Sequence, residues 1–344
     1  MSDVKKMDES AAPSARRRFA IKEIYSRYGV LIILAIMIVA SSLLSPAFLT
    51  GRNVLNVLRQ MSIITIIAFG STMVIISGMI DLSPGSVVAL SGVIGTSVYV
   101  MTGSIALGLV SGVAAGALTG LVCGFLVTKF DLPPFIVTLA MMTGARGMVL
   151  LYTGGKPIIN IGDFTILGQG NLLSIPVPIL IMFVILALVL LLVKRTRFGR
   201  YIYAIGGNEA AAIASGVNVK GIKTITFILA GMLTGLAGVI LMSRINSGQP
   251  SAGLNFELDA ITTVVIGGTS LSGGIGTITG TLAGGVIVGI LSNILNLTNV
   301  SPYWQQIVKG LVIVMAVIMD IKTKGSRRSK NYGDRLLNPR IPSI

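Results

Sequence analysis

The chain of 344 residues is 53% hydrophobic and only 11% charged, and its mean hydropathy is +0.88. A soluble domain of this composition could not keep its apolar surface out of water, so the chain requires lipid as its solvent. The single cysteine, Cys123, excludes an intramolecular disulfide framework, and the absence of histidine excludes histidine-based catalytic or metal sites. The net charge of the chain is +15.

The N-terminal segment, residues 1–28, is polar and basic and has no apolar core, which predicts a cytoplasmic tail and not a cleavable signal peptide. The long apolar stretches after it predict an all-α, polytopic transmembrane bundle of about ten helices. Apolar runs such as residues 179–193 do not alternate with a period of two, which excludes a transmembrane β-barrel. The expected helices lie near residues 30–45, 54–77, 84–101, 105–128, 134–152, 175–193, 222–244, 257–271, 276–297 and 303–320.

Basic residues gather at the ends of these spans, at residues 16–18, 194–200 and 322–330. Because positive charge is retained on the cytoplasmic side, this pattern predicts an even number of spans with both termini in the cytoplasm of a bacterial cell, in the inner membrane. The expected organisation is a transmembrane domain over residues 29–321, a cytoplasmic loop at 194–222 and a cytoplasmic tail at 322–344.

Polar residues near predicted helix breaks are the first candidates for function. The segment IDLSPGSVVALSG at 80–92 loosely matches FELDAITTVVIGG at 256–268, which pairs Asp81 with Glu257. Ionisable residues are costly within a bilayer, so these carboxylates either cap helix N-termini and form ion pairs, or line a translocation path. The residues selected for a path or a helix break are Asp81, Ser83, Asn246, Glu257 and Asp259.

Glycines recur every four residues in two places, which indicates two related halves joined through residues 194–221. Such spacing forms a groove along one face of a helix and lets another backbone approach closely. The groove predicts close packing, either on a helix of the same subunit or against a second subunit. The glycines concerned are Gly108, Gly112, Gly116, Gly120 and Gly124 in the first half, and Gly276, Gly280 and Gly284 in the second.

The cytoplasmic loop contains a short helix signal. After Gly206 and Gly207, Asn208 is a plausible N-cap for the helix EAAAIAS, which ends at Gly216. This helix either lies in a shallow groove on another protein or merely connects two spans.

No motif in the sequence indicates catalysis or metal binding by this chain. It has no GxxxxGK[ST] phosphate loop and no acid-rich metal cluster, so it is not expected to hydrolyse ATP, to carry catalytic residues or to bind a metal or cofactor. The glycine-rich string SGGIGTITG at 272–280 is expected to be a bend that opens the ninth helix.

The loop segment GRYIYAIGGNEAAAIASGVNV at 199–219 resembles the cytoplasmic loop of ribose- and galactose-type sugar permeases, the membrane subunits of ATP-binding-cassette importers. The resemblance extends, in order and at similar spacing, over residues 78–92, 132–147, 257–281 and 300–310. One departure is Pro84, where relatives often have Val or Ala. A proline in the first turn of a helix is tolerated.

The resemblance implies the ABC importer permease fold and a homodimer that docks on cytoplasmic ATPase subunits. Those subunits bind the ATP and magnesium, and a periplasmic sugar-binding protein delivers the sugar. The short loop helix looks like the family's coupling helix, through which ATP hydrolysis drives alternating access. The residues expected to couple are Gly207, Asn208, Glu209, Ala212, Ser215 and Gly216.

The cargo implied is a ribose-like monosaccharide, with galactose, xylose, allose, inositol and a sugar-like signalling molecule left open, and some relatives pair two different permeases. A secondary transporter is the main alternative, because its halves can also be related by internal repeats. An exposed coupling helix argues against it, and the lack of a nucleophile and base pair argues against an intramembrane enzyme.

Overall fold

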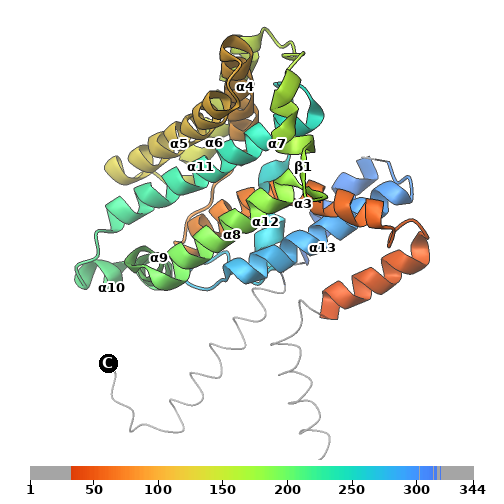
Figure 1. The fold of residues 1–344 in the computed structure, drawn as a ribbon. Coiled ribbons are helices and arrows are strands. Elements are labelled where there is room, and N and C mark those ends of the chain that lie inside the picture. The colour runs from red at the N-terminus through yellow and green to blue at the C-terminus, as the bar shows by residue number, and fades with distance from the viewer. Residues whose placement is uncertain (1–31, 302, 313, 316–317, 319–344) are drawn as a thin grey trace, which may run out of the picture.

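A computed structural model describes residues 32–301, 303–312, 314–315 and 318 of the chain, which form an all-α bundle (Figure 1). The predicted tails at 1–28 and 322–344 lie outside the described residues, so the expected domain limits stay a prediction. After a helix at Ile32–Leu44, the labelled helices are α3 Gly51–Ile76, α4 Pro84–Thr102, α5 Ile105–Lys129, α6 Pro134–Thr153, α7 Ile166–Gln169, α8 Val177–Arg195, α9 Arg197–Gly207, α10 Glu209–Ala214, α11 Val219–Ile245, α12 Phe256–Ile266 and α13 Ile278–Leu297.

Among the described residues, seven helices are long and apolar enough to cross a membrane: α3, α4, α5, α6, α8, α11 and α13. Residues 303–312 are also helical. Each of the ten predicted helices therefore has a counterpart in the structure, and the predicted fold class is confirmed.

The predicted helix at 257–271 is wrong in its length. The observed helix, α12, has 11 residues, which span about 16 Å, roughly half of a bilayer core of about 30 Å. It ends at Gly267, and Gly268 follows with φ +86°. That left-handed conformation suits glycine and stops the helix.

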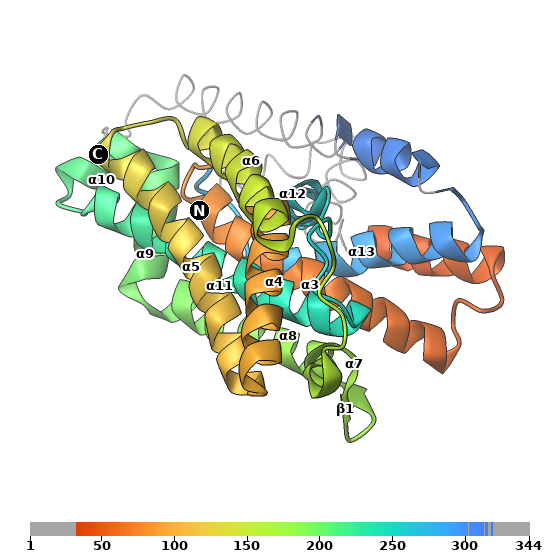
Figure 2. The same cartoon turned by 90° about the horizontal axis from the view of Figure 1, so that it is seen from above.

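Two ends of the bundle can be recognised. The connection from α6 to α8 carries the 3-10 helix η1 Gly162–Thr165, α7 and a hairpin of β1 Asn171–Leu172 with β2 Ile175–Pro176, and we call this the hairpin end. From there α8 runs for 19 residues, about 28 Å, to α9 and α10, at what we call the α10 end. Figure 2 shows α9 and α10 at one side of the bundle and α7 and β1 at the other.

The first glycine series lies along the contact between α5 and α11. A Cβ on Gly120 would meet the Phe227 carbonyl, and one on Gly124 would lie 2.8 Å from the Thr224 Cα. The facing helix contributes Gly231 and Gly235, so the two backbones approach each other at glycine on both sides. The groove is thus filled within the subunit. Gly108 and Gly112 continue it onto α4, whereas Gly116 meets Gly231 and Gly235.

The second glycine series packs in the corresponding way. Gly280 and Gly284 lie against the backbone of α12 at Gly267 and Thr263, and Gly276 lies against Thr269. The next face of α13 meets α3, where a Cβ on Gly289 would lie 2.9 Å from the Met61 Cβ. Both glycine series therefore bring helices into close contact inside one chain.

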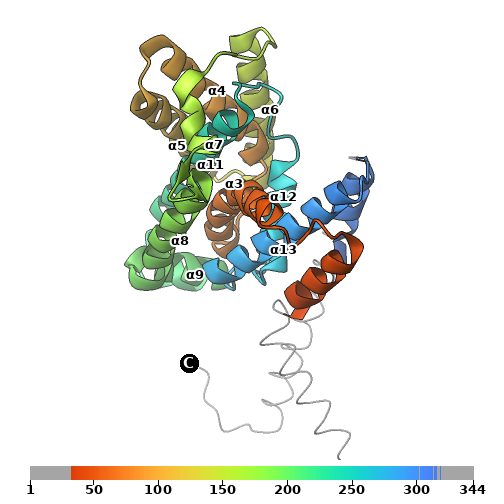
Figure 3. The same cartoon turned by 45° about the vertical axis from the view of Figure 1, so that its right-hand side comes forward.

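The two related halves interlock. From the first half, α5 packs on α11 of the second, and from the second half, α13 packs on α3 of the first, while α3 and α11 also contact each other. Figure 3 shows α3 crossing α12 and α13 on one side, with α5 and α11 together on the other. The long helix of each half, α3 or α11, therefore packs on a helix of the other half, α13 or α5.

The glycine contact predicts that Gly116→Ala destabilises the protein. The added methyl would collide with the Gly231 and Gly235 backbone, which no rotamer change can relieve, and overpacking of this kind costs typically 1–3 kcal/mol. The measurement is thermal unfolding in lipid nanodiscs.

Gly144→Ala in α6 is the matched control, because a Cβ there meets nothing within 4 Å. Alanine is also the better helix former, so this control should unfold at or above the wild-type temperature. Equal unfolding temperatures for the two variants would show that the α5–α11 contact tolerates a side chain.

Candidate functional site

The helix α10 forms as the sequence predicts. The Asn208 side chain accepts a hydrogen bond of 3.0 Å from the Ala211 N–H, which confirms it as the N-cap. At the other end Gly216 has φ +79° and closes the helix. Figure 1 places α10 at the tip of the bundle, beyond α9 and the start of α11.

A small apolar cluster holds α10 on its own subunit. Ala212 is 4% exposed and packs with Ile205 and Val219. A salt bridge of 2.7 Å between Glu209 and Lys223 adds a second tie to α11. Glu209 is half-exposed, so this pair contributes little on its own.

The outer face of α10 is open. Ile213 is 59% exposed, and Gly207, Asn208, Ser215 and Gly216 are exposed around it. Of the predicted coupling residues, Ala212 instead faces inward, where its small side chain lets the helix lie close to α9 and α11. The surface available to a partner is therefore the two capped ends and Ile213.

The helix α9 was not predicted. Basic anchors at 194–200 and a flexible pair, Gly206 and Gly207, were expected here, whereas residues 197–207 form an amphipathic helix. The apolar residues Phe198, Ile202 and Ile205 recur at helical spacing, and Ile202 and Ile205 are buried. That period could have revealed the helix.

The C-terminal end of α9 touches both helix breaks, the one between α3 and α4 and the one between α12 and α13. Gly206 packs on the last turn of α3 at the Ile76 carbonyl, which also accepts a hydrogen bond of 2.8 Å from the Gly274 N–H. A Cβ on Gly273 would lie 2.9 Å from the Gly78 Cα and 3.0 Å from the Gly206 carbonyl. We call Gly78, Gly206, Gly273 and Gly274 the glycine junction.

Tyr203 of α9 adds a polar tie at the same place. Its hydroxyl donates a hydrogen bond of 2.7 Å to the Gly276 carbonyl, just before α13 begins. Burial raises the pKa of the Tyr203 hydroxyl, which keeps it protonated and able to donate. This bond ties α9 to the turn between α12 and α13.

The residues predicted for a path or a break take different positions. Asp81 accepts hydrogen bonds from the Ser83 N–H at 2.8 Å and the Ser83 hydroxyl at 2.7 Å, in a turn that leads into α4 at Pro84. Asn246 is the C-cap of α11 with φ +55°. Asp81 and Ser83 thus shape the turn before α4, and Asn246 ends α11 through its left-handed backbone.

Glu257 belongs to a second polar cluster, at the N-terminus of α12. Its carboxylate lies against Gly85 of α4, where a side chain would collide with it. Arg146 of α6 donates from Nη1 to the carbonyls of Pro250 at 2.6 Å and Ala252 at 2.9 Å. From Nη2 it reaches the Gly85 carbonyl at 3.2 Å. One arginine thus ties α6 to the irregular backbone before α12 and to the first turn of α4.

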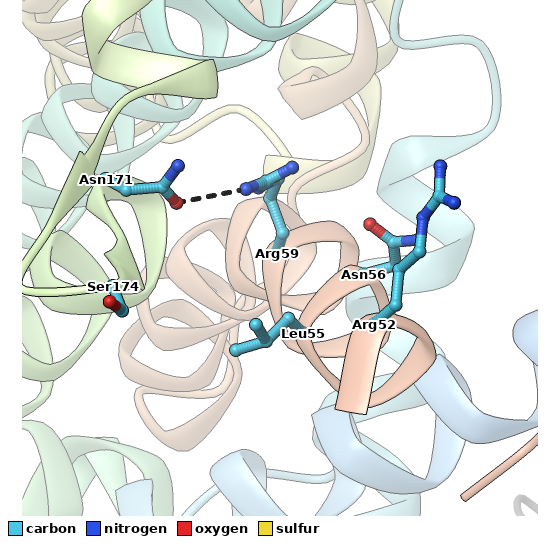
Figure 4. A pocket seen from close by; sticks show the side chains of 6 residues that line it. All are labelled: Arg52, Leu55, Asn56, Arg59, Asn171 and Ser174. Atoms are coloured by element: carbon cyan, nitrogen blue, oxygen red, sulfur yellow. Dashed lines mark hydrogen bonds between the residues drawn. The ribbon is translucent and has the colours of Figure 1, made fainter. Parts of the chain in front are cut away.

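Two cavities lie toward the hairpin end. One, of about 560 Å³, is lined by Arg52, Leu55, Asn56, Arg59, Asn171 and Ser174 (Figure 4). Arg59 reaches across it to the Asn171 side chain at 3.3 Å, while its Nε is buried without a partner in the described structure. The cavity is therefore strongly basic.

The other cavity, of about 160 Å³, lies between α3, α11, α12 and α13, and Asp259 forms part of its wall. Asp259 differs from Asp81 and Asn246, because from the first turn of α12 it lines a cavity and pairs with Lys309. Asp259 and Lys309 stand out in the sequence as charges in or near the spans, whereas Gln60 and Ser292 of the same cavity do not.

Comparison with known proteins places this geometry in a family. Residues 53–317 match the family model described as branched-chain amino acid transport system / permease component. The ribose import permease protein RbsC of Bacillus subtilis (strain 168) is 46% identical over 89% of this chain and 96% of its own length. RbsC of Escherichia coli (strain K12) is 44% identical over 89% of this chain and 97% of its own length.

More distant relatives carry another sugar in their names. The L-arabinose transport system permease protein AraH of Escherichia coli (strain K12) is 37% identical over 93% of this chain and 98% of its own length. No solved structure matches the chain. The chain belongs to this family of ATP-binding-cassette import permeases, as a multi-pass subunit of the inner membrane, and membership implies an ATPase and a substrate-binding protein as partners.

The polar cluster around Arg146 predicts a structural requirement. Arg146→Gln should lower the unfolding temperature in nanodiscs, because a hydrogen bond to a charged group is worth about 1.5–3 kcal/mol and the shorter amide cannot reach both Gly85 and the loop before α12.

Arg146→Lys is the informative companion variant. It keeps the charge, but a single ammonium cannot replace a planar fork that contacts three carbonyls. We expect it to be destabilised as well. Wild-type stability for Arg146→Lys would mean that the charge, and not the hydrogen-bond geometry, is what matters.

Proposed function

We propose that this permease imports ribose or a closely related monosaccharide, and that ATP hydrolysis in a separate subunit drives the import. The cargo rests on identity: the ribose permeases match at 44–47%, whereas the arabinose permeases match at 36–37%. The family model's description names branched-chain amino acids, but a closer match over nearly the whole chain is the better guide to the substrate.

The observation that carries the mechanism is the continuous path from the exposed face of α10 to the breaks in the membrane helices. Ile213 is presented outward, Ala212 fixes α10 to α9 and α11, and the glycine junction and Tyr203 fix α9 to both breaks. An ATPase that pulls on α10 would therefore move the turns before α4 and α13. Such a movement is what alternating access requires.

In this proposal the α10 end faces the cytoplasm. The basic residues of that end, Lys194, Arg195, Arg197, Arg200, Lys220 and Lys223, support the orientation by the positive-inside rule. The hairpin end then faces the periplasm, where the basic cavity of Arg52 and Arg59 suits an acidic surface of the sugar-binding protein.

The remaining partners follow from the same proposal. Two copies of this chain assemble as a homodimer in the lipid, each docked through α10 on an ATPase subunit that binds the ATP and magnesium. This chain supplies no cofactor site and no covalent chemistry, and its contribution is mechanical.

Docking through α10 is tested by Ile213→Asp. If Ile213 enters a groove on the ATPase, a carboxylate there must be buried without a partner, and losing an interface anchor of about 1.4 kcal/mol or more weakens binding at least tenfold. The measurement is the amount of ATPase subunit that stays bound during purification of the complex in nanodiscs, together with sugar-stimulated ATP hydrolysis.

Ile159→Asp is the control, because Ile159 is 62% exposed in the loop after α6, at the hairpin end. It should retain the ATPase subunit in full. If Ile213→Asp also retained it, or if the chain alone moved sugar down an ion gradient, the coupling role of α10 would have to be abandoned.

Transmission through α9 is tested by Tyr203→Phe. This change removes only the hydrogen bond to the Gly276 carbonyl, so the ATPase should still bind and hydrolyse ATP while less sugar enters proteoliposomes per ATP. A loss of about 1 kcal/mol of coupling corresponds to roughly a fivefold lower ratio.

Tyr201→Phe is the matched control two residues away, because the Tyr201 hydroxyl makes no hydrogen bond with the described residues. Its ratio of sugar to ATP should equal that of the wild type. A normal ratio for Tyr203→Phe would remove the Tyr203 bond from the coupling path.

A further inference from the structure

The cavity of about 160 Å³ is walled by helices from both halves of the chain. Polar side chains reach it from α3, α11, α12, α13 and the helical segment 303–312, elements far apart in the sequence. Its polar lining consists of Gln60, Arg244, Asp259, Ser292 and Lys309, and Phe256 lies beside them.

An ion pair forms one wall. Lys309 Nζ donates to Asp259 Oδ2 at 2.9 Å, and the two side chains are only 28% and 13% exposed. Both side chains of this ion pair keep unused hydrogen-bonding capacity. Asp259 Oδ1 accepts no hydrogen bond from a described residue, and the ammonium has three protons of which one is used.

The other polar side chains of the cavity are also uncommitted. Gln60, Arg244 and Ser292 are partly buried, and none of these side chains makes a hydrogen bond with a described residue. Polar groups within the spans of a membrane protein are costly unless they meet a partner or a wet cavity. Their convergence on one space therefore indicates a polar occupant.

Size and charge narrow the class of that occupant. At about 30 Å³ for each water molecule in the liquid, the cavity holds the volume of about five waters, which suits one monosaccharide better than an oligosaccharide. The lining carries two cationic side chains, Arg244 and Lys309, and one carboxylate, Asp259, so it repels cations. Its donors and acceptors suit a polyhydroxylated ring, and Phe256 adds an apolar side chain to the lining that suits the C–H face of a sugar.

We infer that this cavity is a contact site for the neutral monosaccharide during its passage, in which Asp259 accepts hydrogen bonds from sugar hydroxyls and Gln60, Lys309 and Ser292 bind the same sugar. The inference rests on the proposed function and adds to it the residues that touch the cargo. A purely structural role for the ion pair is the competing explanation, and the two make different predictions.

The test uses the complete complex of permease, ATPase and binding protein in proteoliposomes, with radiolabelled ribose at saturating binding protein. Gln60→Leu and Asp259→Asn should each lower the sugar imported per ATP by about tenfold, the effect of losing one hydrogen bond to a buried polar or charged group. ATP hydrolysis stimulated by the loaded binding protein should remain, because the docking surfaces are unchanged.

Two further variants separate the explanations. The double exchange Asp259→Lys with Lys309→Asp rebuilds the ion pair with its ends reversed, so a structural role predicts restored import, whereas a sugar contact predicts continued loss. Ser111→Ala in α5 is the control for Ser292→Ala, because the Ser111 hydroxyl bonds only the Gly108 carbonyl of its own helix. Thermal unfolding of each variant shows that it is folded.

The possible results are distinct. Loss of import in Gln60→Leu, Asp259→Asn and the double exchange, with normal import in Ser111→Ala, supports the sugar site. Full import by the double exchange, or by Gln60→Leu and Asp259→Asn, overturns it. If the wild-type complex itself imports no ribose with ATP, the proposed function fails, and that result is recognised before any variant is compared.

Discussion

Backbone that leaves the helical path inside a lipid-embedded protein must find its hydrogen bonds within the protein, because no water is there to supply them. Among the turns where this chain leaves the helical path, three stand out: those before α4, before α12 and before α13. They are held by a few specific groups: Asp81 in the turn before α4, Arg146 on the carbonyls before α12, and the Ile76 carbonyl for the Gly274 N–H.

Close helix packing makes the breaks possible. In lipid the hydrophobic effect does not drive helices together, so α5 and α11 depend on glycine faces that allow close backbone packing. Because α5 packs on α11 through its glycines and α13 packs on α3 at Gly289, the two halves cannot move independently of each other. When the halves are interlocked in this way, a small displacement of one helix is taken up at the irregular turns between helices.

The glycine junction is the place where a displacement of α9 would reach the membrane helices. Glycine at 78, 206, 273 and 274 lets α9 lie directly on the ends of α3 and on the turn before α13, with no side chains between them. Backbone contact transmits movement better than flexible side chains do, because packed interfaces rearrange between discrete states. The same helices, α3, α12 and α13, also wall the cavity of Asp259 and Lys309, so α9 and the proposed sugar contact lie on common helices.

The sequence by itself determined the solvent, the number and approximate limits of the helices, the relation of the two halves and the capped helix at Asn208, because hydropathy, glycine spacing and N-cap chemistry act over a few neighbouring residues. It did not determine the end of α12, where a local glycine conformation decided the outcome, and the amphipathic period of α9 was present in the sequence but not used. Only the tertiary structure decided that Ala212 faces inward and that Asp81 holds the turn at Ser83 while Asp259 lines a cavity. Gln60, Arg244, Ser292 and Lys309 join Asp259 through contacts between helices far apart in the chain, and no local pattern encodes which helix faces meet.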